Sequence, residues 1–207
     1  MFGDRFHLAV RYEEILRTDG VLRGLVGPRE AGRMWERHLF NCAAIGPAID
    51  PGATVADVGS GAGLPGIVLA ISRPDLKICL VEPLLRRATF LTEVVARLDL
   101  SGVEVRRGRA EALHGKLIVD VVTARAVAPL ERLAAWCLPL LRPGGLLLAL
   151  KGERAVDELL AAEPALPGLG GASWGVDLMG QGMVDPLVRV VRVRRADTDW
   201  RGGHAAP

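Results

Sequence analysis

The stretch DVGSGAGLPG at residues 57–66 decides the fold of this 207-residue chain. It overlaps a short apolar run, TVADV at 54–58, and leads into the apolar segment GIVLAI at 66–71. Glycine permits a positive φ and close backbone approach, so a loop this rich in glycine predicts a tight connection between a buried strand and a helix. Such a loop at the carboxyl end of a first strand opens a crevice where a nucleotide-like ligand can lie against the backbone.

Strand-like and helix-like segments alternate on the carboxyl side of this loop. Further strands are expected at 77–83, 103–108, 118–126 and 146–152. Helices are expected at 64–72, 84–100, 129–141 and 153–163, with a turn at RPGG, residues 142–145. The helix at 84–100 is predicted to bury one apolar stripe, made of Leu84, Ala88, Leu91, Val95 and Leu98. This alternation predicts an α/β fold with a mostly parallel sheet and helices on both faces.

The two ends of the chain depart from this rhythm. Residues 1–50 have helical spacing and are expected to form an N-terminal helical extension, with Pro28 in the first turn of a helix that runs toward His38. Near the other end, 174–180 and 186–193 are strand-like with no helix between them, which predicts an antiparallel hairpin and brings the sheet to seven strands. The core is therefore expected at 51–195, followed by a frayed tail at 196–207.

Composition limits the class of protein. The chain has 26 Lys+Arg and 24 Asp+Glu, so 26 − 24 gives a net charge of +2, and half of its residues are hydrophobic. This is typical of a soluble globular protein and still compatible with nucleic-acid binding, which needs only a local basic patch. Three scattered cysteines without metal-ligand spacing predict neither a disulfide framework nor a metal site, and they favour a reducing cytoplasm. No signal peptide or membrane span is predicted.

The glycine loop could hold either of two cofactors. The sequence GAGLPG at 61–66 satisfies the dinucleotide pattern GxGxxG. Three features favour S-adenosylmethionine: Asp57 precedes the first glycine by two residues, Gly59, Gly61 and Gly63 form GxGxG, and the sheet is expected to end in a hairpin. Glu82, at the end of the second predicted strand, can accept hydrogen bonds from ribose hydroxyls. A glycine-rich turn without a ligand is the remaining alternative.

Several motifs together resemble one known family. They are DVGSGAGLPGIVLAI at 57–71, RAEAL at 109–113, TARAVAPL at 123–130, LALKG at 148–152 and RHLFNCAAI at 37–45. They resemble the small-subunit rRNA methyltransferase G family, also called glucose-inhibited division protein B, from about residue 10 to about residue 195. The resemblance implies a Rossmann-like class I methyltransferase. It also implies that S-adenosylmethionine methylates N7 of a guanine of 16S rRNA, at position 527 in the 530 loop.

The resemblance also assigns residues. It implies cofactor contacts at Gly59, Leu64, Ala110, Glu111 and Arg125. In this assignment Ala110 and Glu111 meet the adenine. The family often shows an acid and a serine after its Arg-His pair, where this chain has Asn41-Cys42, so no role is assigned to that pair.

The chemistry of the target atom limits what the protein must supply. Guanine N7 has an exposed lone pair and carries no proton. We therefore expect no general base, no Ser-His-Asp set and no catalytic metal. Alignment of nitrogen, methyl and sulfur is then the main source of catalysis, an effect that can be worth roughly 7–11 kcal/mol.

Basic residues are the candidates for the substrate side. Arg125 and Lys151 end predicted strands and could face the substrate, and His38 is a third candidate; ion pairs or structural hydrogen bonds are the alternative for each. The arginines that could face RNA phosphates are Arg33, Arg37, Arg106, Arg107 and Arg189. The expected partner is 16S rRNA or the small ribosomal subunit, bound by a monomer. A nicotinamide-dependent oxidoreductase and a non-catalytic RNA-binding module remain alternatives.

Overall fold

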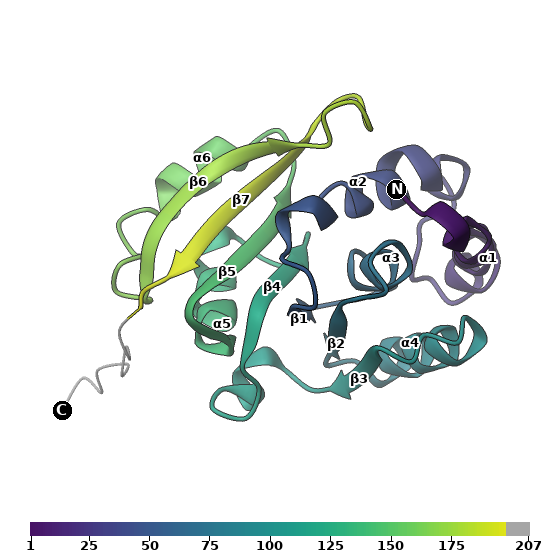
Figure 1. Ribbon diagram of the computed structural model, residues 1–207, viewed down its shortest axis with the longest axis horizontal. Helices are drawn as coiled ribbons and strands as arrows, with labels where there is room; N and C mark the ends of the chain where they lie inside the picture. The colour runs from purple at the N-terminus through teal and green to yellow at the C-terminus, as the bar shows by residue number, and fades with distance from the viewer. Residues whose placement is uncertain (198–207) are drawn as a thin grey trace.

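One sheet of seven strands, in the order β3-β2-β1-β4-β5-β7-β6, organises the chain (Figure 1). The structure is a computed structural model and describes residues 1–197. The strands are β1 (Thr54–Val58), β2 (Lys77–Glu82), β3 (Val103–Arg107), β4 (Val119–Arg125), β5 (Leu141–Lys151), β6 (Gly171–Met179) and β7 (Val188–Arg195). The pairs among β1 to β5 are parallel, whereas β7 runs antiparallel to both β5 and β6. The predicted mostly parallel sheet with a final hairpin is confirmed.

Helices cover both faces of the sheet, as predicted. They are α3 (Gly66–Ser72), α4 (Leu85–Arg97), α5 (Leu130–Cys137) and α6 (Ala155–Ala162). One core cluster joins Val55 and Leu80 of the sheet to Ile67 of α3, and the other joins Val122 to Leu133 of α5. Because successive side chains of a strand point to opposite faces, β1, β4 and β5 each contribute to both clusters.

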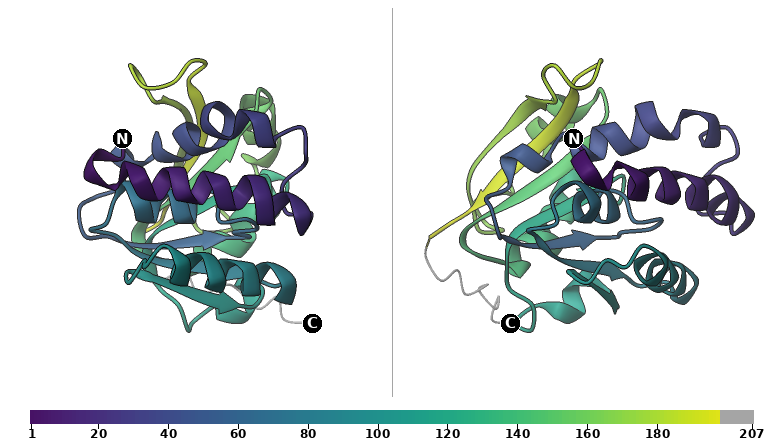
Figure 2. Two further views of the ribbon diagram at one scale, coloured as in Figure 1. Left: turned by 90° about the vertical axis from the view of Figure 1, so that its right-hand side faces the viewer. Right: turned by 45° about the vertical axis from the view of Figure 1, so that its right-hand side comes forward.

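The N-terminal extension is helical and packs against the core. It comprises α1 (Phe6–Ile15), α2 (Phe40–Ala43), the 3-10 helices η1 (Gly3–Arg5), η3 (Ala31–Arg33) and η5 (Gly46–Ala48), and the π-helical segments η2 (Leu16–Gly20) and η4 (Trp35–Leu39). Figure 2 shows α1 lying across the helices on one face of the sheet. The fully buried Tyr12 donates a hydrogen bond of 2.7 Å to the carbonyl of Ala62, inside the glycine loop. The extension therefore supports the loop directly.

Three local expectations are wrong. The helix expected from Pro28 begins only at Ala31, because residues 27–30 close a turn in which Glu30 donates its N–H to the Gly27 carbonyl. In α4, Leu84 precedes the helix and is 51% exposed, whereas Phe90 and Val94 are buried. The third is the predicted RPGG turn.

The RPGG sequence interrupts β5 without reversing the chain. Pairing with β4 jumps from Val119↔Leu141 to Val121↔Leu146, so residues 142–145 bulge out of the ladder. Gly144 accommodates the bulge with a φ of +70°. Leu141 is fully buried and pairs with Val119, so the strand begins before the bulge and continues after it.

The predicted tail at 196–207 lies largely outside the described residues, which end at 197. Among residues 1–197, no helix has both the length and the hydropathy needed to cross a membrane.

Candidate active site

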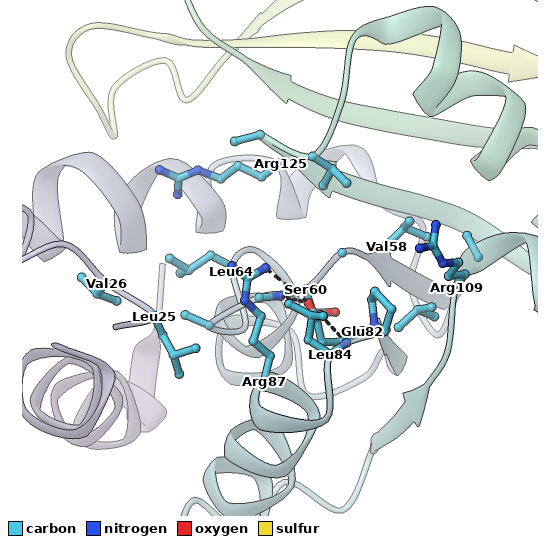
Figure 3. Close-up of a pocket in the computed structure, with 18 of the residues that line it drawn as sticks. Leu25, Val26, Val58, Ser60, Leu64, Glu82, Leu84, Arg87, Arg109 and Arg125 are labelled. Atoms are coloured by element: carbon cyan, nitrogen blue, oxygen red, sulfur yellow. Dashed lines mark hydrogen bonds and ion pairs between the residues drawn. The ribbon is translucent and has the colours of Figure 1, made fainter. Parts of the chain in front are cut away.

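A cavity of about 580 Å³ opens at the carboxyl ends of β1, β2 and β4. Its volume lies within the range of roughly 300–1,000 Å³ typical of small-molecule sites. Figure 3 shows side chains that converge on it from the glycine loop, from α4, from the segments after β3 and β4, and from the extension. The lining includes seven of the residues that the sequence predicted to contact a cofactor: Gly59, Gly61, Leu64, Glu82, Ala110, Glu111 and Arg125. Segments far apart in sequence thus meet in one crevice.

The glycine loop forms the floor of the cavity as a tight turn. Gly59, Gly61 and Gly63 all have positive φ, at +70°, +58° and +101°. At Gly63 a Cβ atom would lie 2.7 Å from the hydroxyl oxygen of Tyr12. The extension therefore packs too closely against the loop for any side chain at this position.

Asp57 holds the loop from behind. Its side chain is fully buried, and its Oδ2 accepts the N–H of Gly66 at 3.0 Å, at the start of α3. Burial raises the pKa of Asp57 to about 7, although the hydrogen bond from Gly66 opposes the shift. This geometry gives Asp57 the role of holding the glycine loop against the start of α3.

Glu82 presents a nearly buried carboxylate to the cavity. Its side chain is 1% exposed, its Oε2 accepts the N–H of Gly61 at 3.0 Å, and its Oε1 accepts the N–H of Leu84 at 2.9 Å. A carboxylate oxygen can accept two hydrogen bonds. One acceptor position on each oxygen therefore stays open toward the cavity, which suits the two hydroxyls of a ribose.

The sequence reasoning missed Arg87, which lies beside Glu82 on α4. Its Nη1 is 4.0 Å from Glu82 Oε2, and its buried Nε has no hydrogen-bond partner among residues 1–197. Figure 3 shows its guanidinium reaching over the loop toward Leu64. The only sequence signal was its position off the apolar stripe of α4, which any exposed arginine shares.

The segment after β3 forms another wall. Ala110 and Glu111 begin the short turn η6 (Ala110–Leu113), with Ala110 buried and Glu111 exposed. Trp136 of α5 lines the cavity as well, and no sequence pattern had marked it. Arg109, on the rim, is exposed.

His38 and Arg125, 87 residues apart, come into direct contact. Arg125 Nη2 donates to His38 Nδ1, and its Nη1 lies 3.3 Å from the sulfur of Cys42. His38 Nε2 lies 2.8 Å from Oε2 of Glu30, a residue that the sequence reasoning did not mark. Burial, and then the charge of Arg125, lower the pKa of His38 below its ordinary value. His38 is therefore neutral near pH 7.

Lys151 and Arg189 lie on the sheet face opposite to Arg125. Arg125 is in register with Leu150, and Lys151 with Arg189, and successive residues of a strand face opposite ways. The Lys151 ammonium donates to the Ala128 carbonyl at 2.8 Å and to Glu158 at 2.6 Å. Neither basic residue belongs to the cavity lining within the described part of the chain.

The other arginines proposed for RNA lie on different elements. Arg33 and Arg37 belong to the extension, and Arg37 pairs with Glu30 at 3.0 Å. Arg106 and Arg107 lie on the edge strand β3, where Arg106 is paired with Glu104 at 2.8 Å. In residues 1–197 no three His, Cys, Asp or Glu side chains are grouped so as to hold a metal ion.

These features define a class I methyltransferase: a sheet of this order with one antiparallel strand, and a glycine loop under a cavity at the carboxyl edge. Solved structures agree on the fold. A predicted O-methyltransferase from Agrobacterium tumefaciens superimposes with a TM-score of 0.60 at 20% identity, over 76% of this chain and 80% of that one. Aeropyrum pernix fibrillarin, solved with bound S-adenosyl-L-methionine, gives 0.55 at 20% identity, over 74% and 76%.

The particular family follows from sequence comparison. The model of the rRNA small subunit methyltransferase G family matches residues 5–174. A protein of Streptomyces avermitilis named ribosomal RNA small subunit methyltransferase G is 61% identical over 194 residues, 93% of this chain and 82% of that protein. Its namesake in Thermobifida fusca is 56% identical over 207 residues, 100% and 87% of the two chains. This chain belongs to the rRNA small subunit methyltransferase G family, which confirms the resemblance noted above.

Proposed function

We propose that this protein transfers the methyl group of S-adenosylmethionine to N7 of a guanine in the 530 loop of 16S rRNA, position 527. The observation that carries the proposal is where the family match falls. It spans residues 5–174, and all the lining residues, from Leu25 to Trp136, lie inside that range. The segments that build the cavity are therefore those that the family shares.

The residues of the cavity fit this cofactor. The open acceptor positions of Glu82 suit the ribose hydroxyls. The Ala110 N–H suits adenine N1, the Glu111 carboxylate suits the exocyclic amine, and Arg125 suits the methionine carboxylate. Bound there, S-adenosylmethionine supplies a methyl group on a positively charged sulfur.

The chain itself has to align the reactants. Guanine N7 attacks with a lone pair and loses no proton, so the site needs no general base. The cavity walls orient the cofactor, and a base that leaves its stack could enter beside the extension. Arg109, an exposed residue of the lining, offers positive charge to RNA phosphates that approach the cavity. We propose that the protein acts as a monomer, since the cavity is complete within one chain. We also propose that it acts in the cytoplasm, where an rRNA methyltransferase meets its substrate.

Labelled S-adenosylmethionine tests the proposal. The protein is incubated separately with free 16S rRNA and with small subunits from cells that lack it, and the methylated nucleotide is mapped. We expect label as N7-methylguanosine at position 527. Glu82→Ala should lower kcat/KM at least about tenfold, the loss expected for a charged hydrogen-bonding partner. The matched control, Glu104→Ala on edge strand β3, should stay near wild type.

Other outcomes would identify the alternatives. Label at another nucleotide would overturn the assignment of the target. RNA binding without any incorporated label would favour a non-catalytic RNA-binding module. Calorimetry that shows NAD binding more tightly than S-adenosylhomocysteine would favour an oxidoreductase.

A further inference from the structure

Glu30 connects the N-terminal extension to the cavity. It lies in the turn before η3, lines the cavity, and its side chain is 33% exposed. Its Oε2 is 2.8 Å from His38 Nε2, and its Oε1 accepts from Arg37 Nη1 at 3.0 Å. Arg37 therefore engages one oxygen and the neutral His38 ring the other. These partners keep the pKa of Glu30 below its ordinary value, with the hydrogen bond to His38 contributing most.

The partners of His38 fix where its proton lies. A guanidinium has only donors, so His38 Nδ1 has to accept from Arg125. The ring proton is then on Nε2, where it is donated to Glu30. The hydrogen bonds run in one direction, from Arg125 through His38 to Glu30.

Arg125 has few other strong acceptors. Among residues 1–197 its remaining partners are the Cys42 sulfur and the Arg37 carbonyl, each at 3.3 Å. A thiol sulfur is a weak acceptor, and 3.3 Å is long for a charged hydrogen bond. The orientation of the guanidinium therefore depends chiefly on His38.

We propose that Glu30 is a positioning residue for cofactor binding: it holds His38 with the proton on Nε2, and His38 in turn holds Arg125 toward the cofactor. The inference rests on the proposed function, in which Arg125 meets the methionine carboxylate. It gives the extension a part in cofactor binding through a side chain more than 90 residues away from Arg125 in the sequence.

Two other ion pairs tie the extension to the core and supply matched controls. Arg23 lies 2.6 Å from Glu93, and Arg97 lies 2.5 Å from Asp19, so both pairs join the extension to α4. None of these four residues lines the cavity in the described part of the chain. Glu93→Ala therefore breaks a tether of the extension without touching the Glu30–His38–Arg125 chain.

Affinity and turnover separate positioning from folding. Glu30→Ala should raise the Kd for S-adenosylhomocysteine and the KM for S-adenosylmethionine roughly 5- to 20-fold, the coupling typical of adjoining hydrogen-bonded residues. The kcat at saturating cofactor should change less than about twofold, because only cofactor binding is affected. Glu30→Gln keeps an oxygen for the His38 N–H and should recover most of the affinity, which keeps the test valid if the alanine variant folds poorly. Glu93→Ala should leave both constants at wild-type values.

A double-mutant cycle tests the route through His38. Adding Glu30→Ala to His38→Ala should weaken S-adenosylhomocysteine binding no further, since the link is already broken. Additive losses, an unchanged Kd in Glu30→Ala, or an equal loss in Glu93→Ala would overturn the inference. A wild-type protein that binds S-adenosylhomocysteine but methylates no rRNA would overturn the proposed function alone. If the wild-type protein methylates rRNA and the Glu30→Ala variant binds S-adenosylhomocysteine with the wild-type Kd, only the inference is overturned.

Discussion

Val127 occupies the space that a side chain at Gly59 would need. A Cβ atom at Gly59 would lie 2.8 Å from Val127 Cγ2, and Gly59 has a φ of +70°. Gly59 follows β1 and Val127 follows β4, so the ends of two neighbouring strands interlock at the floor of the cavity.

Gly59→Ala should therefore damage the cofactor site in two ways. The clash with Val127 displaces the loop, and a left-handed alanine costs about 1–2 kcal/mol. We expect calorimetry to show at least about tenfold weaker S-adenosylhomocysteine binding. Adding Val127→Ala should restore part of the affinity, because it removes the clash and leaves the backbone cost. A double variant no better than Gly59→Ala would show that the contact is not what excludes a side chain.

Ala126, between Arg125 and Val127, has a φ of +53°. A glycine at position 126 would adopt this conformation without strain, but it would lose more conformational entropy on folding than the alanine does. The relief of strain and the entropy loss therefore partly cancel. Ala126→Gly should raise the free energy of unfolding by up to about 1 kcal/mol, measured by urea denaturation. A destabilisation of that size would indicate that the alanine methyl group makes a packing contact that outweighs the strain.

Lys151→Met should lower the free energy of unfolding and leave cofactor binding unchanged. The Lys151 side chain is 7% exposed, and its removal leaves Glu158 and the Ala128 carbonyl without their donor. Unpaired polar groups of this kind cost about 1–3 kcal/mol. The Kd for S-adenosylhomocysteine and the KM for rRNA should stay within about twofold of wild type, since Lys151 faces away from the cavity.

The matched control for this variant is Lys77→Met, which changes an exposed lysine at the start of β2 and should be nearly neutral. A strong increase in the KM for rRNA in Lys151→Met alone would revive the substrate-facing role that the sequence suggested.

Asp120 should make stability sensitive to acid. It accepts hydrogen bonds from the Thr54 hydroxyl at 2.6 Å and from Arg142 at 2.6 Å, and these bonds lower its pKa from 3.8 to about 2. The folded carboxylate binds a proton less readily than the unfolded one, so its contribution is complete above pH 3.8 and is lost as the pH falls toward 2. Because Asp120 is partly exposed and solvent screens its charge, its ionised form contributes on the order of 1 kcal/mol to the free energy of unfolding.

Asp120→Asn should remove this part of the acid sensitivity. Urea denaturation of both proteins between about pH 5 and pH 2 measures it, and the two stabilities should converge at the acid end. If the difference in the free energy of unfolding between the two proteins stays constant across this pH range, the Asp120 carboxylate does not titrate within it.

Local signals in the sequence were enough for most of the fold. The strand at 54–58, the glycine loop and the helix after it follow one another within about twenty residues, and each is encoded by its own apolar pattern or glycines. Glu82 could be predicted for the same reason, because the carboxyl ends of neighbouring parallel strands meet at one edge of a sheet. RPGG was misread because a turn and a bulge share their glycines, and only the pairing with β4 on both sides of residues 142–145 distinguishes them.

By itself the sequence determined the order of strands and helices along the chain and the glycine loop proposed for the cofactor, since these depend on interactions between near neighbours in the chain. Only the tertiary structure decided which distant side chains share the cavity. It brought Glu30 and His38 to Arg125, and it turned Lys151 to the other face. For Lys151 the physical reason is strand register: a shift of one residue reverses the face of every side chain, and packing of the whole core sets that register. Glu30 and His38 reach Arg125 because the extension buries side chains such as Tyr12 and Leu39 against the core.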